Sequence, residues 1–372
     1  MTNLKLITLL LLAVLLINSG CGDDEETPTP SNGTTLATAA AETWTWIPKD
    51  NMFSRNGSTT GYIANLKPDA TKLVIYLQGG GACFNPAVCG QNANSFGEAD
   101  AQSTIANLQS PLIFNRGNAD NQFADWHYIF VPYSTGDVHS GTNSDADVPN
   151  GGPADQLMVG ATNFSAIVED LQAYFNTNGA PDEILVTGSS AGGYGVYLNF
   201  VQIADAFGTD ITLTGLADAS PIFFDTNLFA ECLNANWEVL WNFDYPDDLD
   251  NLVSGTYAYD VQKVYEYASV KYPNANFGLI STYEDDVIRQ FLSFGTAGCT
   301  GLPGVLSGTA FKNGLIDMQN TLVNFPNWKV FFTEGTAHTF LGSPTLNQSV
   351  NGMDLNDWIA QLRAGNAADM ME

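Results

Sequence analysis

One stretch, residues 183–198, constrains the fold of this chain more than any other. It reads Glu-Ile-Leu-Val-Thr-Gly-Ser-Ser-Ala-Gly-Gly-Tyr-Gly-Val-Tyr-Leu. The apolar run Ile184–Val186 predicts a buried strand, and the absence of proline afterwards is compatible with a helix. Between them, Gly188–Gly192 has the pattern G-x-S-x-G, in which small residues let a strand turn sharply into a helix and expose a serine oxygen. A short pentad also occurs by chance, so the strand and helix around it carry the prediction that Ser190 sits at such a turn.

The rest of the chain alternates apolar runs with segments of helical periodicity. From Glu42 the aromatic density rises, and we expect antiparallel edge strands there. We expect further strands over residues 72–77, 126–133, 183–187, 213–219, 277–282 and 328–333, and helices over residues 156–175, 193–207, 257–271, 310–324 and 354–362. This alternation predicts an α/β fold, a mostly parallel sheet flanked by helices, and the serine pentad makes it α/β-hydrolase-like.

Two long segments between these elements are expected to border a site. Residues 84–125 are rich in Asn, Gly and Ser, and a loop of that length is uncommon unless it is functional, so we expect a short helix within it. Residues 221–256 break the strand–helix rhythm and carry many Phe and Trp residues, which predicts an inserted lid. Sites in open α/β sheets lie beyond the carboxyl ends of the strands, and that is where we look for polar groups.

The N-terminus has the composition of an export signal. Residues 1–20 contain a lysine, an apolar run and then small residues before Cys21, which predicts a secretory leader too short for a comfortable membrane span. Cys21 resembles the acylated cysteine of bacterial lipoproteins, although Asn18 stands where Leu, Val or Ile is usual. Lipidation of Cys21 is our prediction, and plain cleavage that leaves a free cysteine is the alternative.

The regions after the leader differ in composition. Residues 21–41 are acidic and then rich in Thr, Pro, Ser and Ala, which predicts a flexible tether. We expect one catalytic domain over residues 42–366 and a disordered tail over residues 367–372. The protein is then an outer-membrane or cell-surface lipoprotein, or otherwise periplasmic or secreted, that touches the membrane only through its lipid anchor. We expect a monomer.

The other cysteines form an even set in an oxidising compartment. Their simplest pairing joins Cys83 to Cys89 and Cys232 to Cys299, and no spacing suggests a metal site, so we expect disulfides and neither metal nor cofactor. The formal net charge is −28. Such a surface repels nucleic acid and disfavours a strongly anionic substrate.

A serine hydroxyl needs an imidazole to accept its proton and a carboxylate to orient that imidazole. His127 lies inside an apolar strand and is expected to be a core residue. His139 lies in a Gly/Ser loop, where it either lines the site or is exposed. His338 follows the final strand, where an α/β-hydrolase presents its base, and is our candidate.

The carboxylate should lie between Ser190 and His338 in the chain. Glu284, Asp285 and Asp286 follow the strand that ends near residue 282, although carboxylates there can equally cap a helix. Asp218, after the preceding strand, is the runner-up and can instead fix a turn.

Ester hydrolysis also needs hydrogen-bond donors for the developing oxyanion. Gly79–Gly81 follows the first buried strand, as the glycine-rich loop does in esterases, and Ala191 follows the serine. The backbone amides of Gly80, Gly81 and Ala191 are therefore the expected donors, with a plain flexible turn as the alternative reading of the glycines.

With these residues in hand, the chain resembles the pectin acetylesterase and Notum family of serine carboxylesterases. The matching blocks are Leu77-Gln-Gly-Gly-Gly-Ala-Cys-Phe-Asn85 with Cys89, Gly188-Ser-Ser-Ala-Gly-Gly193 with Gly195 and Asn199, Leu216-Ala-Asp218, and the block around His338. The chain departs from the family at Gly81-Ala82, where a bulky residue is usual, and matches it loosely over residues 283–287.

The resemblance implies an α/β-hydrolase fold, a Ser190/Asp285/His338 triad and a disulfide between Cys83 and Cys89. It also implies an oxyanion hole made by Gly80, Gly81 and Ala191. We expect an esterase that removes acetyl or other short acyl groups from a polysaccharide. The alternatives are a lipase or aliphatic polyester hydrolase with the same triad, and a catalytically silent glycan-binding lipoprotein.

Overall fold

The computed structural model of the protein describes residues 34–300 and 304–372. The predicted leader, Cys21 and most of the predicted tether lie outside the described residues. Within the described residues, no helix is long and apolar enough to cross a membrane.

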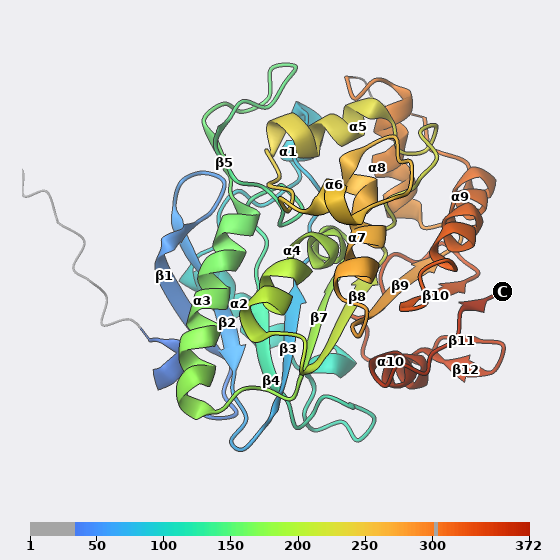
Figure 1. Ribbon diagram of the computed structural model, residues 1–372. Coiled ribbons are helices and arrows are strands. Elements are labelled where there is room, and N and C mark those ends of the chain that lie inside the picture. The colour runs from blue at the N-terminus through green and yellow to red at the C-terminus, as the bar shows by residue number, and fades with distance from the viewer. Residues whose placement is uncertain (1–33, 301–303) are drawn as a thin grey trace, which may run out of the picture. The chain divides into compact units, whose positions relative to one another are not determined.

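A nine-stranded sheet runs through the described part of the chain (Figure 1). From β4 onwards every neighbouring pair of strands is parallel, whereas β1 and β2 are antiparallel additions at one edge. In spatial order the strands are β1 (Thr45–Phe53), β2 (Thr59–Asn65), β4 (His127–Val131), β3 (Lys72–Leu77), β7 (Glu183–Ser189), β8 (Thr212–Asp218), β9 (Asn276–Thr282), β10 (Trp328–Thr333) and β13 (Met370–Met371). The α/β-hydrolase-like fold class is confirmed.

Helices cover both faces of this sheet. The longer ones are α2 (Glu98–Asn107), α3 (Gly160–Asn178), α4 (Ala191–Phe207), α7 (Val264–Lys271), α8 (Asp286–Thr296), α9 (Gly308–Leu322) and α10 (Leu355–Arg363). The short helices are η1 (Leu36–Thr38), α1 (Pro86–Cys89), η2 (Leu112–Phe114), α5 (Glu231–Ala235), η3 (Asn236–Leu240), α6 (Leu249–Leu252) and η4 (Asp260–Lys263). Two small hairpins, β5 (Asn143–Ala146) with β6 (Gln156–Met158) and β11 (Ser349–Val350) with β12 (Met353–Asp354), complete the elements.

Strand residues alternate between two cores because successive side chains point to opposite faces of a sheet. In β3, Leu73, Ile75 and Leu77 pack into the core shared with α3, α4, α7 and α9. Val74 and Tyr76 face the other core, which contains α2, η2 and α10. The predicted strands are therefore buried on both sides, which explains their continuous apolar runs.

The two ends of the domain differ from the prediction. Residues 367–372 are not a disordered tail, because Met370 and Met371 pair with Phe331 and Phe332 of β10. Asp369 supports this pairing by accepting hydrogen bonds from the Val330 amide at 2.9 Å and the Gln319 side chain at 3.0 Å. At the other end, the predicted tether was too long, since Leu36 is buried in the core and residues 34–372 form one compact unit.

Several predicted helices begin with another element. The helix expected over residues 156–175 starts with strand β6 before α3 begins at Gly160, and the helix expected over residues 257–271 starts with the 3-10 helix η4. Both differences arise because periodicity indicates an apolar face but not where the backbone first becomes α-helical.

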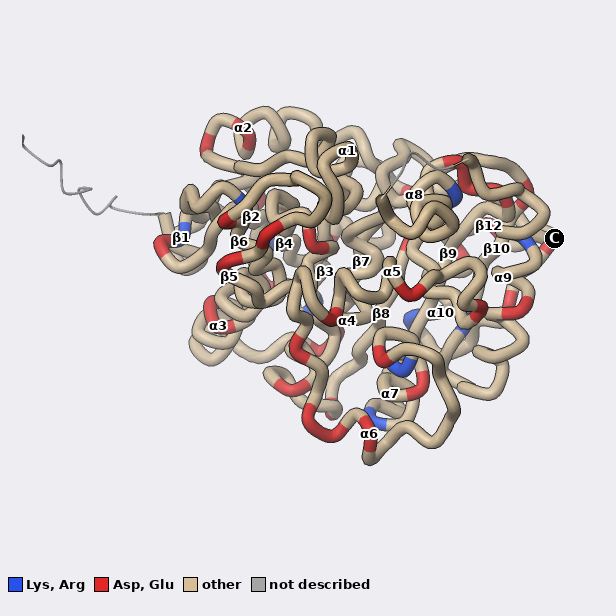
Figure 2. Tube along the Cα trace, turned by 90° about the horizontal axis from the view of Figure 1, so that it is seen from above, with Lys and Arg blue, Asp and Glu red and all other residues tan. Residues whose placement is uncertain are grey.

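The aromatic segment expected to form a lid folds into α5, η3 and α6. Helix α5 lies next to α8 beyond the carboxyl ends of β3 and β7, whereas α6 lies apart from them against α7 (Figures 1 and 2). Its η3 is a π-helix, in which the Trp241 amide bonds the Asn236 carbonyl at 2.7 Å. π-Helical turns are rare and occur frequently at functional sites.

Two disulfides, Cys83–Cys89 and Cys232–Cys299, form within the described residues. The first closes the segment that follows β3, and the second joins α5 to the segment after α8. Acidic residues are distributed around the whole periphery of the described chain, with few basic residues among them (Figure 2).

Candidate active site

Ser190 occupies a strained turn between β7 and α4. Its φ of 57° and ψ of −123° lie in a region that non-glycine residues rarely adopt. The surrounding glycines make room for this turn: a Cβ atom on Gly79 would stand only 2.6 Å from the Ser189 carbonyl oxygen. Ser190 is 8% exposed, and strain of this kind is typical of a serine held up at the end of a strand.

His338 and Asp285 form a hydrogen-bonded pair at the ends of neighbouring strands. Asp285 follows β9 and His338 follows β10, and the His338 Nδ1 lies 2.8 Å from Asp285 Oδ2. Asp285 is fully buried, and its Oδ1 caps α8 by accepting bonds from the amides of Val287 and Ile288 at 2.9 and 2.8 Å. The helix amides therefore hold the Asp285 carboxylate in a fixed position next to the imidazole.

The other predicted carboxylates do not face His338. Asp286 is exposed and pairs with Arg289, and Glu284 lies 3.9 Å from the same guanidinium. Of the three adjacent acidic residues, only Asp285 contacts the imidazole within the described chain. The expected helix-capping role and the expected contact with the histidine thus fall on the same side chain.

Asp218 binds the serine turn to the loop that carries His338. Its Oδ2 accepts bonds from Ser189 Oγ at 2.7 Å and from the amides of Phe340 and Leu341 at 2.8 and 2.9 Å. Its backbone carbonyl accepts the Ser190 amide at 2.7 Å. Burial raises the pKa of the Asp218 carboxyl, and these hydrogen bonds oppose the rise. Asp218 therefore positions two parts of the site without touching the imidazole.

Hydrogen bonds to its carbonyl groups hold the glycine loop after β3 in place. Tyr133 Oη donates to the Gly81 carbonyl at 2.9 Å and accepts from the Val138 amide at 2.9 Å. The Gly80 carbonyl accepts a bond from the Asn92 side chain. The amides of Gly80, Gly81 and Ala191 bond no acceptor in the described chain, so these N–H groups are free to serve an oxyanion.

We expected His139 either to line the site or to be exposed, and it does neither. It is 2% exposed and its Nε2 donates to the Gln78 carbonyl at 2.8 Å, directly before the glycine loop. Its ring packs on Tyr133 with 4.7 Å between centroids. Burial lowers the pKa of His139 to about 4, so its imidazole is neutral at neutral pH. Sequence reasoning missed this bracing role and that of Tyr133, although both residues follow β4 at the edge where a site was expected.

His127 is a core residue, as predicted. It is 4% exposed, and both ring nitrogens are bonded, Nδ1 to the Lys67 amide at 3.2 Å and Nε2 to the Ala70 carbonyl at 2.9 Å.

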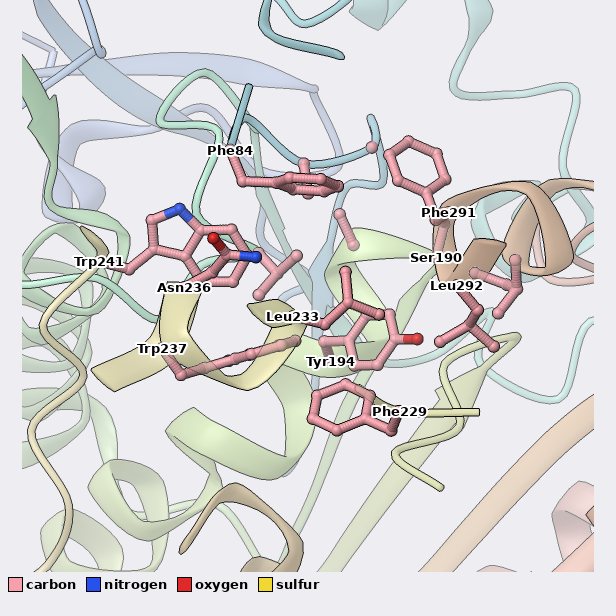
Figure 3. A pocket seen from close by; sticks show the side chains of 15 residues that line it. Phe84, Ser190, Tyr194, Phe229, Leu233, Asn236, Trp237, Trp241, Phe291 and Leu292 are labelled. Carbon is pink, nitrogen blue, oxygen red and sulfur yellow. The ribbon is translucent and has the colours of Figure 1, made fainter. Parts of the chain in front are cut away.

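An apolar pocket adjoins Ser190 (Figure 3). The predicted lid contributes one wall through α5 and η3, and α8 contributes another. The lining residues are Gly81, Ala82, Phe84, Val138, Ser190, Ala191, Tyr194, Phe229, Leu233, Asn236, Trp237, Trp241, Ile288, Phe291 and Leu292. Gly81 and Ala191, two of the three expected oxyanion donors, thus border the same cavity as the serine.

Ser190 and His338 do not hydrogen-bond to each other among the described contacts, and the Ser190 hydroxyl bonds no other described residue. Bonds of this kind are often long before a substrate binds and tighten with it. The shared contacts of Asp218 with Ser189 and Phe340 nonetheless bring the two segments together.

Comparison with known proteins finds similarity over much of the chain. The sequence pattern of the Pectinacetylesterase family matches residues 43–244, more than half of the chain. Palmitoleoyl-protein carboxylesterase notum1a of Danio rerio is 25% identical over 180 residues, 47% of this chain and 35% of the relative. Palmitoleoyl-protein carboxylesterase NOTUM of Drosophila melanogaster is 24% identical over 213 residues, 52% of this chain and 30% of the relative. The chain thus spans about a third of the length of these curated relatives.

Structural similarity to a known protein extends over more of this chain than the sequence similarity does. The crystal structure of the Wnt deacylase Notum from Drosophila superposes with a TM-score of 0.62 at 17% identity, covering 90% of this chain and 96% of that one.

Proposed function

Because the chain belongs to the pectinacetylesterase family, we propose that it is a serine carboxylic ester hydrolase that acts through Ser190, His338 and Asp285. The observation that carries the proposal is the 2.8 Å contact between His338 Nδ1 and buried Asp285. Such an arrangement is the base-and-orienter part of a nucleophilic triad. Asp218 ties the loop of His338 to the strained turn of Ser190.

In the proposed reaction, Ser190 Oγ attacks the ester carbonyl carbon while its proton passes to His338 Nε2. Asp285 accepts the Nδ1 proton in a hydrogen bond, which keeps Nε2 free as the base and stabilises the imidazolium. The tetrahedral intermediate collapses, the C–O bond to the alcohol breaks, and the alcohol leaves with the proton from His338. Water then attacks the acyl carbonyl carbon while His338 Nε2 accepts its proton. The second tetrahedral intermediate collapses, the bond to Ser190 Oγ breaks, Oγ takes the proton from His338, and the acid is released.

The oxyanion of each tetrahedral intermediate would bind the amides of Gly80, Gly81 and Ala191. Their unpaired N–H groups and the bracing of the Gly81 carbonyl by Tyr133 support this role. Fixed donors of this kind contribute on the order of 3 kcal/mol each to the transition state.

The pocket supports a short acyl group. Its free volume is about 50 Å³, which corresponds to roughly four water molecules. An acetyl group or a chain of a few carbons fits this enclosed volume. Acetyl or another short acyl group on a polysaccharide therefore remains the leading substrate, with a lipase or aliphatic polyester hydrolase as the alternative. A silent glycan-binding protein is disfavoured by the complete set of candidate groups.

Export is also proposed. The disulfides Cys83–Cys89 and Cys232–Cys299 suit an oxidising compartment. Lipidation at Cys21 is the proposed means of attachment to the membrane.

The test measures kcat/KM for a series of p-nitrophenyl esters from acetate to dodecanoate. Wild type should prefer the short esters, and Ser190→Ala should lose about ten-thousandfold in kcat with an unchanged melting temperature. Wild-type rates in the alanine variant would sink the mechanism. A rate that rises towards dodecanoate would favour the lipase, and a folded wild type without any esterase activity would favour the glycan-binding protein.

A further inference from the structure

The walls of the pocket beside Ser190 are mostly apolar, but one polar side chain in them is available to a ligand. Apart from Ser190, the polar groups in the lining belong to Tyr194, Asn236, Trp237 and Trp241. Tyr194 Oη donates to the Pro221 carbonyl at 3.2 Å, and Trp241 Nε1 donates to the Cys83 carbonyl at 3.3 Å. The Trp237 Nε1 bonds no acceptor in the described chain, but it is fully enclosed by protein and has no surface to offer to a ligand. Asn236 is left as the group that can offer hydrogen bonds to a molecule in the pocket.

The Asn236 carboxamide has no partner in the described chain, although the residue is only 6% exposed. Its backbone carbonyl bonds the Trp241 amide, but its side chain neither caps a helix nor bonds another side chain. Its polar atoms are not fully enclosed by protein, and the residue lines the pocket. An amide that keeps such an unenclosed surface can bond a group of the substrate in the pocket.

The backbone directs this amide into the cavity. Asn236 opens the π-helix η3, whose wider turn bonds residue 236 to residue 241. Asn236, Trp237 and Trp241 all line the pocket as a result. Figure 3 shows the carboxamide beside the Trp241 indole, on the side of the pocket opposite to Phe291 and Leu292.

We propose that Asn236 is a hydrogen-bonding subsite for the acyl part of the ester, and that the preferred acyl group carries a hydroxyl within a few carbons of the carbonyl. This inference rests on the proposed function, because it assumes that the acyl group attached to Ser190 occupies the pocket. A hydroxyl both donates and accepts, and a carboxamide offers an acceptor oxygen and a donor nitrogen to match it.

The apolar walls make this contact selective. The aromatic side chains of Phe84, Trp237 and Trp241 shield the amide from water, and a hydrogen bond in such surroundings is stronger than in solvent. A plain acyl chain of equal length would cover the amide without bonding it. Sites built to bond a substrate hydroxyl reject the analogue that lacks it more strongly than apolar pockets discriminate by size.

The experiment compares two aryl esters of the same chain length, p-nitrophenyl butyrate and the p-nitrophenyl ester of β-hydroxybutyrate. It measures the ratio of their kcat/KM values in wild type, in Asn236→Leu and in Asn234→Leu. Asn234 is the matched control, because it is a buried asparagine two residues away that does not line the pocket. A ratio within one protein cancels differences in folding or active fraction.

Wild type and Asn234→Leu should favour the hydroxylated ester by about tenfold or more. In Asn236→Leu the ratio should fall to about one or below, since leucine has a similar size and no polar atoms. A wild-type ratio near one, or an unchanged ratio in Asn236→Leu, would overturn the subsite while butyrate turnover leaves the esterase intact. A folded wild type that hydrolyses neither ester would overturn the proposed function and the subsite with it.

Discussion

At the scale of single residues, Asp285 joins two tasks in one carboxylate. Its Oδ1 accepts the amides that begin α8, and its Oδ2 lies 2.8 Å from His338 Nδ1. The helix cap fixes the carboxylate and thereby the imidazole. Asp286, next in the chain, points to the surface and pairs with Arg289.

This difference gives a prediction with a matched control. Asp285→Asn keeps a good helix cap but loses the charge that orients and stabilises the imidazole, so kcat should fall about a thousandfold or more. Asp286→Asn should stay within about threefold of wild type, since exposed ion pairs contribute little. Measurement of kcat for both variants on a short aryl ester tests this prediction. An equal loss in both variants would contradict the assignment of Asp285.

Residue types and their positions indicated Ser190 and His338 but did not choose among three neighbouring carboxylates, and only the family resemblance pointed to Asp285. Ser190 is marked by glycines that its turn requires, and His338 by its place after the last long strand. Glu284, Asp285 and Asp286 occupy one turn, where each successive side chain points in a different direction. The backbone conformation at the end of β9, which composition does not reveal, selects Asp285.

At the scale of elements, the loop after β3 is held by the segment after β4. Tyr133 bonds the Gly81 carbonyl, and His139 bonds the Gln78 carbonyl. Carbonyls that are fixed in this way hold the backbone on either side of the Gly80 and Gly81 amides. The brace links two strand ends that are neighbours in the sheet and about fifty residues apart in the chain.

Removing the Tyr133 hydroxyl should therefore weaken catalysis more than binding. In Tyr133→Phe the ring still packs on His139, but the bonds to Gly81 and from Val138 are lost, so kcat should fall about tenfold with KM within about twofold. Tyr174→Phe on α3 is the control, because the Tyr174 hydroxyl makes no hydrogen bond in the described chain. A rise in KM with unchanged kcat would show that Tyr133 shapes ground-state binding instead.

Long strands and helices were predictable because their apolar periodicity extends over many residues. The strands over residues 72–77 and 328–333 have the predicted bounds. Strand β13 could not be predicted, since two methionines show no period and are ordered by pairing with β10 and by the contacts of Asp369. Contacts between distant segments also explain the burial of His139 in a loop whose composition resembled an exposed one.

At the scale of the whole molecule, His139 couples the site to folding. Burial lowers its pKa to about 4 in the folded protein, against about 6.5 in the unfolded chain. Above pH 6.5 it is neutral in both states. Between pH 6.5 and 4 the unfolded chain takes up a proton that the folded protein does not, so stability is lost as the pH falls.

The contribution of His139 to this loss should be about 2 kcal/mol between pH 7 and 4.5. His139→Gln, which keeps an N–H donor for the Gln78 carbonyl, should lack it. Urea unfolding of both proteins at the two pH values isolates the contribution of His139 to the unfolding free energy, because the other titrating groups are common to both. An identical pH dependence of the two unfolding free energies would contradict the account.

The fold and the chemistry of the site were accessible from the sequence to different extents. The succession of strands and helices along the chain and the serine turn follow from patterns that are local in the chain. The pocket depends on how α5, η3 and α8 meet over the sheet, and an isolated asparagine among aromatic residues gave no signal of its place in the wall. The proposed contact of Asn236 with the acyl group therefore rests on the packed structure.

The central claim is that Ser190 is the nucleophile, and the most direct measurement is the site of covalent labelling by a fluorophosphonate. The folded protein should gain one adduct, and peptide mass spectrometry should locate it on Ser190, with no adduct in Ser190→Ala and a greatly slowed reaction in His338→Ala. An adduct on another residue, or none on the folded wild type, would contradict the account.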